Sequence, residues 1–479
     1  RGMAQHHAPL LKGSGRGKAD IFTWEGLRAI SEDYKSVIIP VAGNIACSYN
    51  VCNIGYVVQL IRLEHPTPRW AAPAFASSCL FGAVVGQLLL GWAGDRFGRR
   101  NAMMVSMILV VVGALGSALL TTGYGNWVWQ TLTMWRFILG IGVGGTYPLS
   151  AVFAGEMVDD RGLGRTARVS MTIAVQIVGN ILAPLLLFLV LLCLGTKKVT
   201  EEPWATEVGW RFLLGVGALP ALLALRELFS ATESHEYLMA KACGNRGRLQ
   251  DVMNALKEEK YQKRLLGAAG GWFCFDLAFF GMVIFLPHVV HDLVDRDDEA
   301  YGYLLVTSAI TTLINLVALP AAILSLRLVA DDSLGRKNLQ AVSFLLISAA
   351  YLILCIFFNT LRSMGAAAAV IALFGLLFFA LNFGAGMTTY MLPQESFPAE
   401  IRSSLNGIAA ASGKVGAMLG AAFFAPSARI FGLGWTFGAC AFVAAGGLVL
   451  TLLVVPDMRK EDDGNGSNVS QAPDVQRRL

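Results

Sequence analysis

The segment Gly91–Arg100 reads GWAGDRFGRR, and a degenerate copy of it, Asp332–Lys337 (DSLGRK), recurs in the second half of the chain. Each copy follows a long apolar run. The spacing between the copies nearly equals the spacing between Glu156 and Glu395, which end two further apolar runs. Two features at one spacing indicate an internal repeat, so we expect the chain to fold as two similar halves.

The composition is that of a polytopic membrane protein. Of 479 residues, 55% are hydrophobic and 15% are charged, whereas soluble domains carry roughly 25% charged residues. A bilayer-spanning helix needs about 20 apolar residues. We count twelve such runs, at 37–61, 71–93, 102–121, 131–155, 169–194, 209–229, 265–290, 302–328, 339–360, 364–391, 403–425 and 432–456.

A hydrophilic stretch divides these runs six and six. The predicted organisation is an N-terminal segment (1–36), a six-helix bundle (37–229), a linker (230–264), a second six-helix bundle (265–456) and a C-terminal tail (457–479). Within the linker, Lys257–Arg264 (KEEKYQKR) fits either a solvated amphipathic helix or a plain connection.

The basic residues predict the orientation of the chain. With both termini in the cytoplasm, the cytoplasmic side carries 28 of the 38 lysines and arginines, and the opposite loops carry seven. Lysine and arginine accumulate on the cytoplasmic side of membrane proteins. We therefore expect the N-terminal segment, the linker and the C-terminal tail to be cytoplasmic, and we favour the plasma membrane over an organelle membrane.

One lysine lies inside an apolar run. Lys414 belongs to Ile401–Gly420, IRSSLNGIAAASGKVGAMLG, in which Gly416-x-x-x-Gly420 allows another helix to approach closely. A lysine at the centre of a bilayer costs ~2.5–3.5 kcal/mol, so it normally faces a cavity or an opposite charge. A side chain that snorkels to the interface is the alternative.

The predicted partner of Lys414 is Asp276. It is the clearest mid-membrane carboxylate of the second half and lies in Gly271–Met282 (GWFCFDLAFFGM), one helical turn from Trp272 on the same face. Two interpretations remain open, a charge pair that binds substrate and a purely structural buried pair.

The run Arg136–Met157, RFILGIGVGGTYPLSAVFAGEM, contains three glycines in a G-x-G-x-x-G pattern. A dinucleotide site needs a preceding strand and a soluble βαβ unit, so we interpret the glycines as a close-packing face. Tyr147 and Pro148 are expected to place a hydroxyl group and a helix irregularity near mid-membrane. Further along the chain, Gln176 and Asn180 share one helix face, which fits inter-helix hydrogen bonding and substrate contact equally well.

Three segments resemble the major facilitator superfamily. GWAGDRFGRR resembles its loop signature, and Arg136 with the glycine-rich run resembles its fourth helix. Thr232-Glu233-Ser234, at the start of the linker, partly matches a P-E-S signature of the superfamily. The resemblance implies an all-α membrane protein with twelve transmembrane helices in two pseudo-symmetric six-helix bundles around a central cavity.

The loop signature also has a physical interpretation. An aspartate can cap a neighbouring helix, and arginines can hold helix ends by charge and dipole. We therefore predict a conformational latch, made of Asp95, Arg96, Arg99, Arg100, Glu156 and Glu395.

Four segments, GGTYPLSAV, WFCFDLAFFG, LNFGAGMTTYMLPQESFPAEIRSS and GIAAASGKVGA, resemble the phosphate:proton symporter family more specifically. The resemblance implies a proton-driven transporter, in which we expect Asp276 to carry the coupling proton. It also implies a set of substrate-binding residues, namely Tyr147, Gln176, Trp272, Asp276, Asn382 and Lys414.

The sequence departs from that family at several positions. Thr146 stands where the family has an aspartate, and Asn50 and Asn53 stand in a region where it has an acidic pair. Phe280 replaces a tyrosine and Gly386 replaces an asparagine. Asp276 is therefore the main candidate for a titrating group on the substrate path.

These observations predict a secondary active transporter of inorganic phosphate, proton-coupled and working by alternating access, and not an enzyme. We expect phosphate or a related anion, protons and the lipid bilayer as partners, without nucleic acid, metal or cofactor. Two alternatives remain: a transporter of an organic anion such as a glycerophosphodiester, and a nutrient sensor that binds its ligand without transporting it.

Overall fold

The computed structural model describes residues 34–156, 164–242, 248–291, 293, 302–331 and 334–456. Within these ranges, eleven helices are long and apolar enough to cross a membrane, and a bent helix pair adds a twelfth span. The all-helical architecture expected from the sequence is therefore confirmed. The Asp332 end of the repeat and both chain termini lie outside the described residues.

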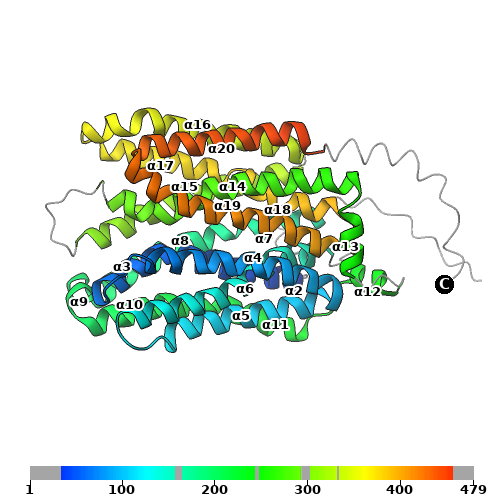
Figure 1. Ribbon diagram of the computed structural model, residues 1–479, viewed down its shortest axis with the longest axis horizontal. Helices are drawn as coiled ribbons and strands as arrows, with labels where there is room; N and C mark the ends of the chain where they lie inside the picture. The colour runs from blue at the N-terminus through cyan, green and yellow to red at the C-terminus, as the bar shows by residue number, and fades with distance from the viewer. Residues whose placement is uncertain are drawn as a thin grey trace, which may run out of the picture.

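The helices form two halves, one above the other in Figure 1. The first half contains α2 (Tyr34–Cys52), α3 (Ile54–Glu64), α4 (Ala71–Phe97), α5 (Arg99–Leu119), α6 (Asn126–Glu156), α7 (Arg165–Ala174), α8 (Gln176–Leu194), α9 (Thr196–Glu201), α10 (Pro203–Val216) and α11 (Ala218–Ser230). The second half contains α14 (Glu259–His291), α15 (Gly302–Asp331), α16 (Gly335–Ser363), α17 (Ala367–Asn382), α18 (Ala385–Ser396), α19 (Arg402–Ile430) and α20 (Leu433–Val454).

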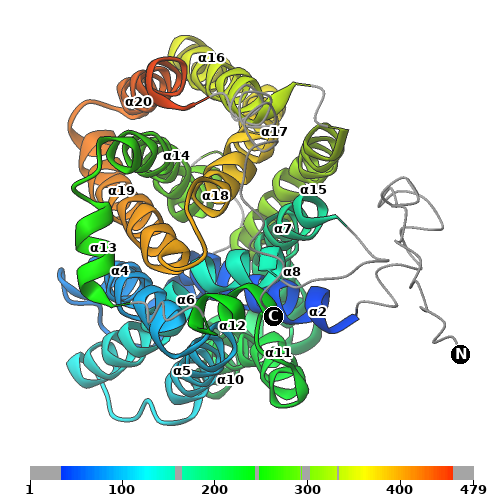
Figure 2. The ribbon, with the colours of Figure 1, turned by 90° about the vertical axis from the view of Figure 1, so that its right-hand side faces the viewer.

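Two short helices, α12 (His235–Ala242) and α13 (Leu249–Ala255), connect the halves at one end of the molecule. Seen from that end, the halves meet along α4 with α19 and along α15 with α7 and α8 (Figure 2). Of the run Lys257–Arg264, the part from Glu259 onward is helical and largely exposed, and it is the first part of α14, which continues from there into the membrane span.

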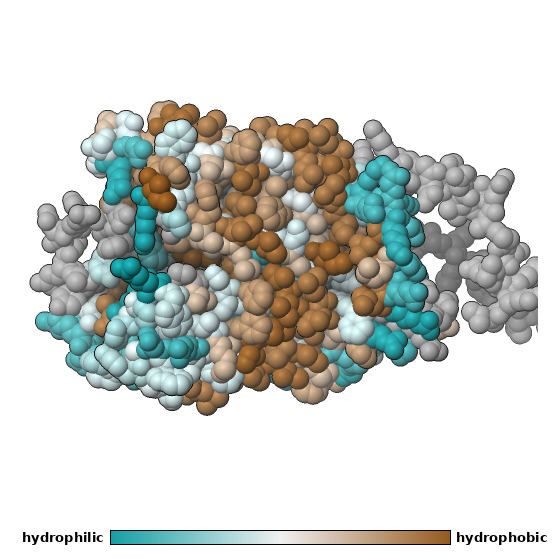
Figure 3. Space-filling view, in the orientation of Figure 1, coloured by the Kyte–Doolittle hydropathy of each residue, from teal (hydrophilic) through white to brown (hydrophobic). Residues whose placement is uncertain are grey.

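The surface agrees with membrane insertion. A broad hydrophobic belt covers the middle of the molecule, and hydrophilic residues gather at its two ends (Figure 3). Large apolar side chains such as Phe442, Leu453 and Leu89 are exposed within the spanning helices, where lipid replaces water as the solvent.

Several spans are broken near mid-membrane. The chain bends by 42° between α2 and α3. A single residue separates the end of α7 at Ala174 from the start of α8 at Gln176. Asn382 ends α17, and Gly384, the residue before α18, has a φ of +74°, a conformation that favours glycine. The irregularity expected at Pro148 is absent, because α6 runs through it without interruption; prolines are tolerated in membrane helices when their surroundings satisfy the freed groups.

Glycines set the closest helix contacts. A Cβ atom at Gly140 or Gly144 of α6 would overlap the α4 backbone, and one at Gly142 would lie 2.6 Å from the Ser106 carbonyl of α5. Gly416 and Gly420 of α19 press in the same way against the α14 backbone. The glycine pattern of α6 is thus a packing face, and the small residues of α19 bring that helix against the helix of Asp276.

The contact between α4 and α19 contains unpaired polar groups. Gly407 packs against the backbone of Gln87. The side chains of Gln87 and Asn406 are fully buried, and among the described residues neither has a hydrogen-bond partner. Buried amides are normally paired, so these two side chains are an exception within the contact between the halves.

Candidate functional site

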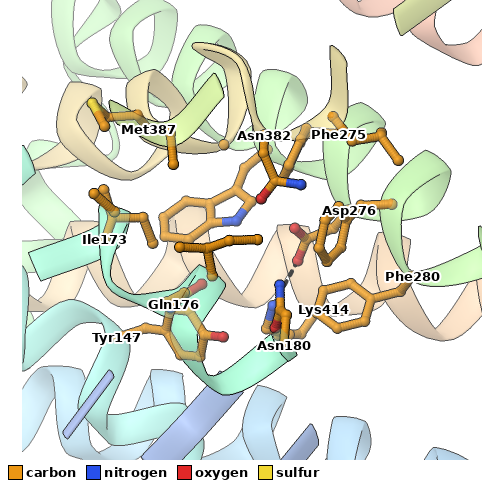
Figure 4. A pocket seen from close by; sticks show the side chains of 17 residues that line it. Tyr147, Ile173, Gln176, Asn180, Phe275, Asp276, Phe280, Asn382, Met387 and Lys414 are labelled. Carbon is orange, nitrogen blue, oxygen red and sulfur yellow. Dashed lines mark hydrogen bonds and ion pairs between the residues drawn. The ribbon is translucent and has the colours of Figure 1, made fainter. Parts of the chain in front are cut away.

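A cavity of about 70 Å³ lies between the two halves (Figure 4). All six predicted substrate-binding residues line it. They come from five helices: Tyr147 (α6), Gln176 (α8), Trp272 and Asp276 (α14), Asn382 (α17) and Lys414 (α19).

Lys414 and Asp276 form an ion pair in the wall of this cavity. The Lys414 Nζ atom lies 2.7 Å from Asp276 Oδ2, and the two side chains are only 2% and 3% exposed. The ammonium group also lies 4.3 Å from the Phe280 ring centre and 4.7 Å from the Tyr147 ring centre. Such burial excludes a lysine that snorkels to the membrane surface, and the two ring faces add cation–π attraction.

Aromatic rings enclose the pair. The Trp272 ring stands edge-on between Tyr147, at 6.5 Å, and Tyr390, at 6.1 Å. Phe275 and Phe279 stack at 5.4 Å and line the same cavity. These rings exclude water and lower the local dielectric constant, which strengthens the field of any charge inside the cavity.

The polar wall opposite the pair is held by hydrogen bonds. Gln176 Nε2 donates to Asn44 Oδ1 at 2.8 Å, and Asn44 Nδ2 donates to Ser150 Oγ at 2.8 Å. Ser150 Oγ in turn lies 2.8 Å from the Tyr390 hydroxyl. This chain connects α8, α2 and α6 of the first half to α18 of the second, and one N–H of Gln176 remains for other partners.

Two asparagines, Asn382 and Asn180, also line the cavity. Asn382, at the end of α17, donates Nδ2 to the Phe378 carbonyl at 2.9 Å. Asn180 receives a hydrogen bond from the Cys52 thiol at 3.1 Å and also lines the cavity. Gln176 and Asn180 therefore combine both expected roles. They form hydrogen bonds to α2, and they line the cavity.

The substituted family positions fall into two groups. Phe280 and Gly386 line the cavity. Asn50 donates to the Gly217 carbonyl at 2.9 Å and Asn53 to the Leu213 carbonyl at 3.2 Å, so both face α10 and α11 instead.

Thr146 donates to the Gly142 carbonyl at 2.9 Å and is also absent from the lining. Of the described residues that line the cavity, only Asp276 carries a carboxylate.

The predicted latch residues lie at the end of the molecule that carries α12 and α13, which we call the latch end. Asp95, near the end of α4, accepts hydrogen bonds from Ser404 N at 2.7 Å, Ser404 Oγ at 2.6 Å and Ser403 N at 3.2 Å. These donors belong to the first turn of α19. A carboxylate of one half thus caps a helix of the other, where the helix dipole favours negative charge.

Glu156 joins the halves at the same end. Its carboxylate contacts Arg99 Nε at 3.0 Å, Arg402 Nη1 at 2.8 Å and Ser234 Oγ at 2.6 Å. Arg99 also contacts Asp95 at 3.0 Å and donates to the Ala399 carbonyl of the second half at 2.6 Å. The result is a buried network of charges that spans both halves.

The remaining latch residues have separate partners. Arg100 donates to the Leu228 carbonyl at the end of α11, at 2.9 Å. Glu395 pairs with Arg336 at 3.3 Å, in the positions of the repeat that correspond to Glu156 and Arg99.

Arg96 presents its carbonyl to the Tyr237 hydroxyl at 3.4 Å. Burial raises the pKa of that hydroxyl, which keeps it protonated as a donor.

Sequence reasoning missed several residues of both sites. Asn44, Ser150 and Tyr390 hold the cavity wall, and Ser404 and Arg402 complete the latch. The available signal for Ser404 and Arg402 was their place at the start of the predicted span 403–425, because the first backbone N–H groups of a helix need partners from outside the helix.

Comparison with known proteins identifies the family. The model of the sugar (and other) transporter family matches residues 36–462. Low affinity inorganic phosphate transporter 4 of Petunia hybrida is 30% identical over 445 residues, which cover 81% of this chain and 82% of that protein. Inorganic phosphate transporter PT2 of Toxoplasma gondii is 29% identical over 395 residues, which cover 81% of this chain and 66% of that protein.

Among solved structures, the proton:xylose symporter XylE bound to 6-bromo-6-deoxy-D-glucose superposes with a TM-score of 0.69 at 21% sequence identity, over 89% of this chain and 96% of that one. This likeness establishes the fold. The chain is therefore an integral membrane transporter, not an enzyme, and belongs to the sugar (and other) transporter family of the major facilitator superfamily.

Proposed function

We propose that the protein is a secondary active transporter of inorganic phosphate that couples transport to protons and works by alternating access. The observation that carries the proposal is the Lys414–Asp276 pair, which places a buried positive charge and a titratable group side by side in a cavity shared by both halves. The names of relatives, several of them inorganic phosphate transporters, support the same substrate.

The size of the cavity favours a small anion. One water molecule needs roughly 10–15 Å³ of such space. The cavity, at about 70 Å³, then accommodates a ligand of about five to seven non-hydrogen atoms on that scale. A phosphate ion is of this size, whereas a hexose or a glycerophosphodiester is much larger.

The lining offers the chemistry that phosphate requires. Lys414 supplies a positive charge. The Tyr147 hydroxyl, the Trp272 indole N–H and the second N–H of Gln176 supply neutral donors to phosphate oxygens. Asp276 accepts a hydrogen bond from a protonated phosphate oxygen, a group that sulfate lacks at neutral pH. This donor and acceptor set gives a physical basis for choosing phosphate over sulfate.

The same pair provides a route to proton coupling. A phosphate ion that draws the Lys414 ammonium group away leaves Asp276 without its partner. An unpaired buried carboxylate is costly, and a proton removes that cost. Substrate and proton then favour each other's binding, and by linkage the coupling is equal in both directions.

We infer that the latch end faces the cytoplasm of the plasma membrane, with both chain termini on that side, as the basic residues indicate. Asp95, Arg99 and Glu156 would then hold the cytoplasmic side of the cavity closed, with Arg100 and Glu395 steadying adjacent helix ends. Their network of contacts across the halves supports this role.

Uptake by purified protein in liposomes tests the proposal. With an imposed pH gradient, we expect accumulation of phosphate against its own gradient, little accumulation of sulfate, and weak competition by glycerophosphodiesters. Strong competition would favour an organic anion as substrate. Specific phosphate binding without any flux would favour a sensor.

The coupling step has its own test. Asp276→Asn should abolish accumulation driven by a pH gradient, while exchange of external for internal phosphate persists. Glu207→Gln is a matched control, since it removes a carboxylate that pairs with Arg211 away from the cavity. If the Asp276 variant still concentrates phosphate on a pH gradient alone, another group carries the proton.

A further inference from the structure

A second cavity, of about 750 Å³, opens between the halves at the end of the molecule opposite the latch. We call it the vestibule. Its walls come from α3, the α3–α4 connection and the start of α4 in the first half, and from α14 and α19 in the second. α3 lies toward the left in Figure 1, where hydrophilic residues gather in Figure 3.

The vestibule lies along the helices that build the central cavity. α14 places Asp276 in the central cavity and His288 in the vestibule, and at 1.5 Å per residue these are about 18 Å apart. α19 does the same with Lys414 and Arg429, about 22 Å apart. The vestibule therefore leads toward the substrate site from the outer end.

Three arginines line the vestibule: Arg62, Arg69 and Arg429. They come from both halves, and Arg62 lies close enough to Arg429 for their like charges to repel. None of the three arginine side chains makes an ion pair or a hydrogen bond with another described residue. Glu64, the nearest carboxylate along α3, instead contacts Trp210 at 3.3 Å and His65 at 3.7 Å.

The three arginines are exposed, and within the described part of the chain no carboxylate lines the vestibule beside them. A cluster of like charges of this kind favours an anion between them. The vestibule walls are otherwise largely apolar, with Ile54, Val58 and Phe285 among them, and a low-dielectric cleft of one sign focuses the field on an approaching ion. Guanidinium groups match the geometry of phosphate oxygens in paired hydrogen bonds.

We propose that the vestibule is a second anion site, which captures soluble phosphate through Arg62, Arg69 and Arg429 before the anion reaches Lys414. The choice of phosphate as the ligand rests on the function proposed above, whereas the site itself rests on the vestibule. A lipid phosphate group offers the same tetrahedral oxyanion, so the experiment must separate the two sources.

A cysteine at Ser77, which lines the vestibule, provides a local probe that does not depend on transport. We would measure the rates at which this cysteine reacts with an anionic and with a cationic methanethiosulfonate reagent, after subtracting the parent protein. The arginines should raise the anionic-to-cationic rate ratio about tenfold, within the range of electrostatic steering. The triple variant Arg62→Gln, Arg69→Gln, Arg429→Gln should lose that preference, and each single variant should lose part of it.

Arg362→Gln is the matched control. Arg362 belongs to the last turn of α16 and does not line the vestibule, so its removal should leave the ratio unchanged. Two results would overturn the proposal. One is an anionic-to-cationic rate ratio that is the same in the triple variant and in the protein with all three arginines. The other is a ratio that falls as far in the Arg362→Gln control as in the triple variant.

Protection by phosphate identifies the ligand and separates the two sites. Millimolar phosphate should slow modification of the Ser77 cysteine, even in the Lys414→Ala background, and should fail to do so in the triple arginine variant. Protection that disappears with Lys414→Ala would assign the effect to the central site and refute a separate one. Protection by phosphatidylglycerol in the vesicles, without any by soluble phosphate, would assign the arginines to lipid and likewise refute it.

Transport kinetics give the functional readout. In phosphatidylcholine vesicles at low ionic strength, the triple variant should show KM for phosphate raised about tenfold with kcat unchanged, and the difference should shrink at high salt. If the parent protein transports no phosphate but the protection holds, the proposed function fails and the vestibule site stands. If the parent protein transports phosphate, but the rate ratio, the protection by phosphate and KM are all the same in the triple variant, only the vestibule inference fails.

Discussion

Neutralising the Lys414–Asp276 pair one residue at a time, and then together, tests whether the two charges act as a unit. We expect Asp276→Asn and Lys414→Met each to destabilise the protein, and the double variant to be more stable than at least one of them. The reason is that a single substitution leaves the other charge buried and unpaired, whereas the double substitution leaves none.

The magnitude follows from the geometry. At the 2.7 Å separation of Nζ and Oδ2, and with an effective dielectric constant of about 20, the attraction is about 6 kcal/mol. Desolvation costs several kcal/mol for each ion, so the intact pair is close to neutral in net stability, while removing one partner costs ~3–5 kcal/mol.

The two single variants should differ. In Asp276→Asn, Lys414 retains its cation–π contacts with the rings of Phe280 and Tyr147. These contacts offset about 0.5–2 kcal/mol of the lost stability. In Lys414→Met, the Asp276 carboxylate keeps no cation, but it can bind a proton. The destabilisation by Lys414→Met should therefore decrease as the pH is lowered, because a protonated carboxyl group carries no charge to bury.

Unfolding in mixed micelles, followed by tryptophan fluorescence, measures the free energy of the parent and the three variants. We expect a coupling energy of about 3 kcal/mol, roughly a hundredfold in the unfolding equilibrium constant. Losses that simply add within ~0.5 kcal/mol would show that the residues are not energetic partners. A single variant as stable as the parent would refute the reasoning about unpaired charge.

Three further outcomes follow from the structure. Lys414→Ala should abolish phosphate binding to the central site while the purified protein still elutes as a folded species; full central-site affinity would exclude Lys414 from that site. Glu156→Gln removes a charged hydrogen bond worth ~1.5–3 kcal/mol. A cysteine at Ser403 in the latch should then react with an impermeant maleimide about tenfold faster, and an unchanged rate would count against the latch. Gly144→Leu should prevent α4 and α6 from packing and lower the folded yield severely, whereas Gly446→Leu, at a position with open space around it, should be tolerated; equal yields would contradict the packing argument.

The sequence predicted the spans and the central pair for clear physical reasons. Bilayer thickness fixes the length of an apolar run, and a charge such as Lys414 inside one requires a partner, for which Asp276 was the clearest candidate. Hydropathy does not register backbone breaks, however, so the interruptions beside Gln176 and Asn382 were not predicted and one was wrongly expected at Pro148.

The latch shows a second limit. Asp95 was predicted to cap a helix, but its partner Ser404 is distant in sequence and looks like any serine at a helix start. The facing direction of Asn50 and Asn53 was equally hidden, because a rotation by only part of a helical turn separates a cavity residue from one that binds the α10–α11 segment. Contacts between the halves depend on the register of helices that are distant in sequence, and hydropathy and local spacing do not reveal that register.

The buried amides of Gln87 and Asn406 bear on the stability of the contact between α4 and α19. Gln87 and Asn406 are buried without partners, and each such group costs ~1–3 kcal/mol relative to a hydrated one. In the alternating-access cycle proposed above, separation of the halves at the latch end would let water reach both amides, and their hydration would offset part of the energy lost as the buried ion pairs open. The contact between the halves is thus stabilised by the buried ion pairs of Glu156 and weakened by two amides without partners, and these opposing contributions reduce the net free energy needed to open it.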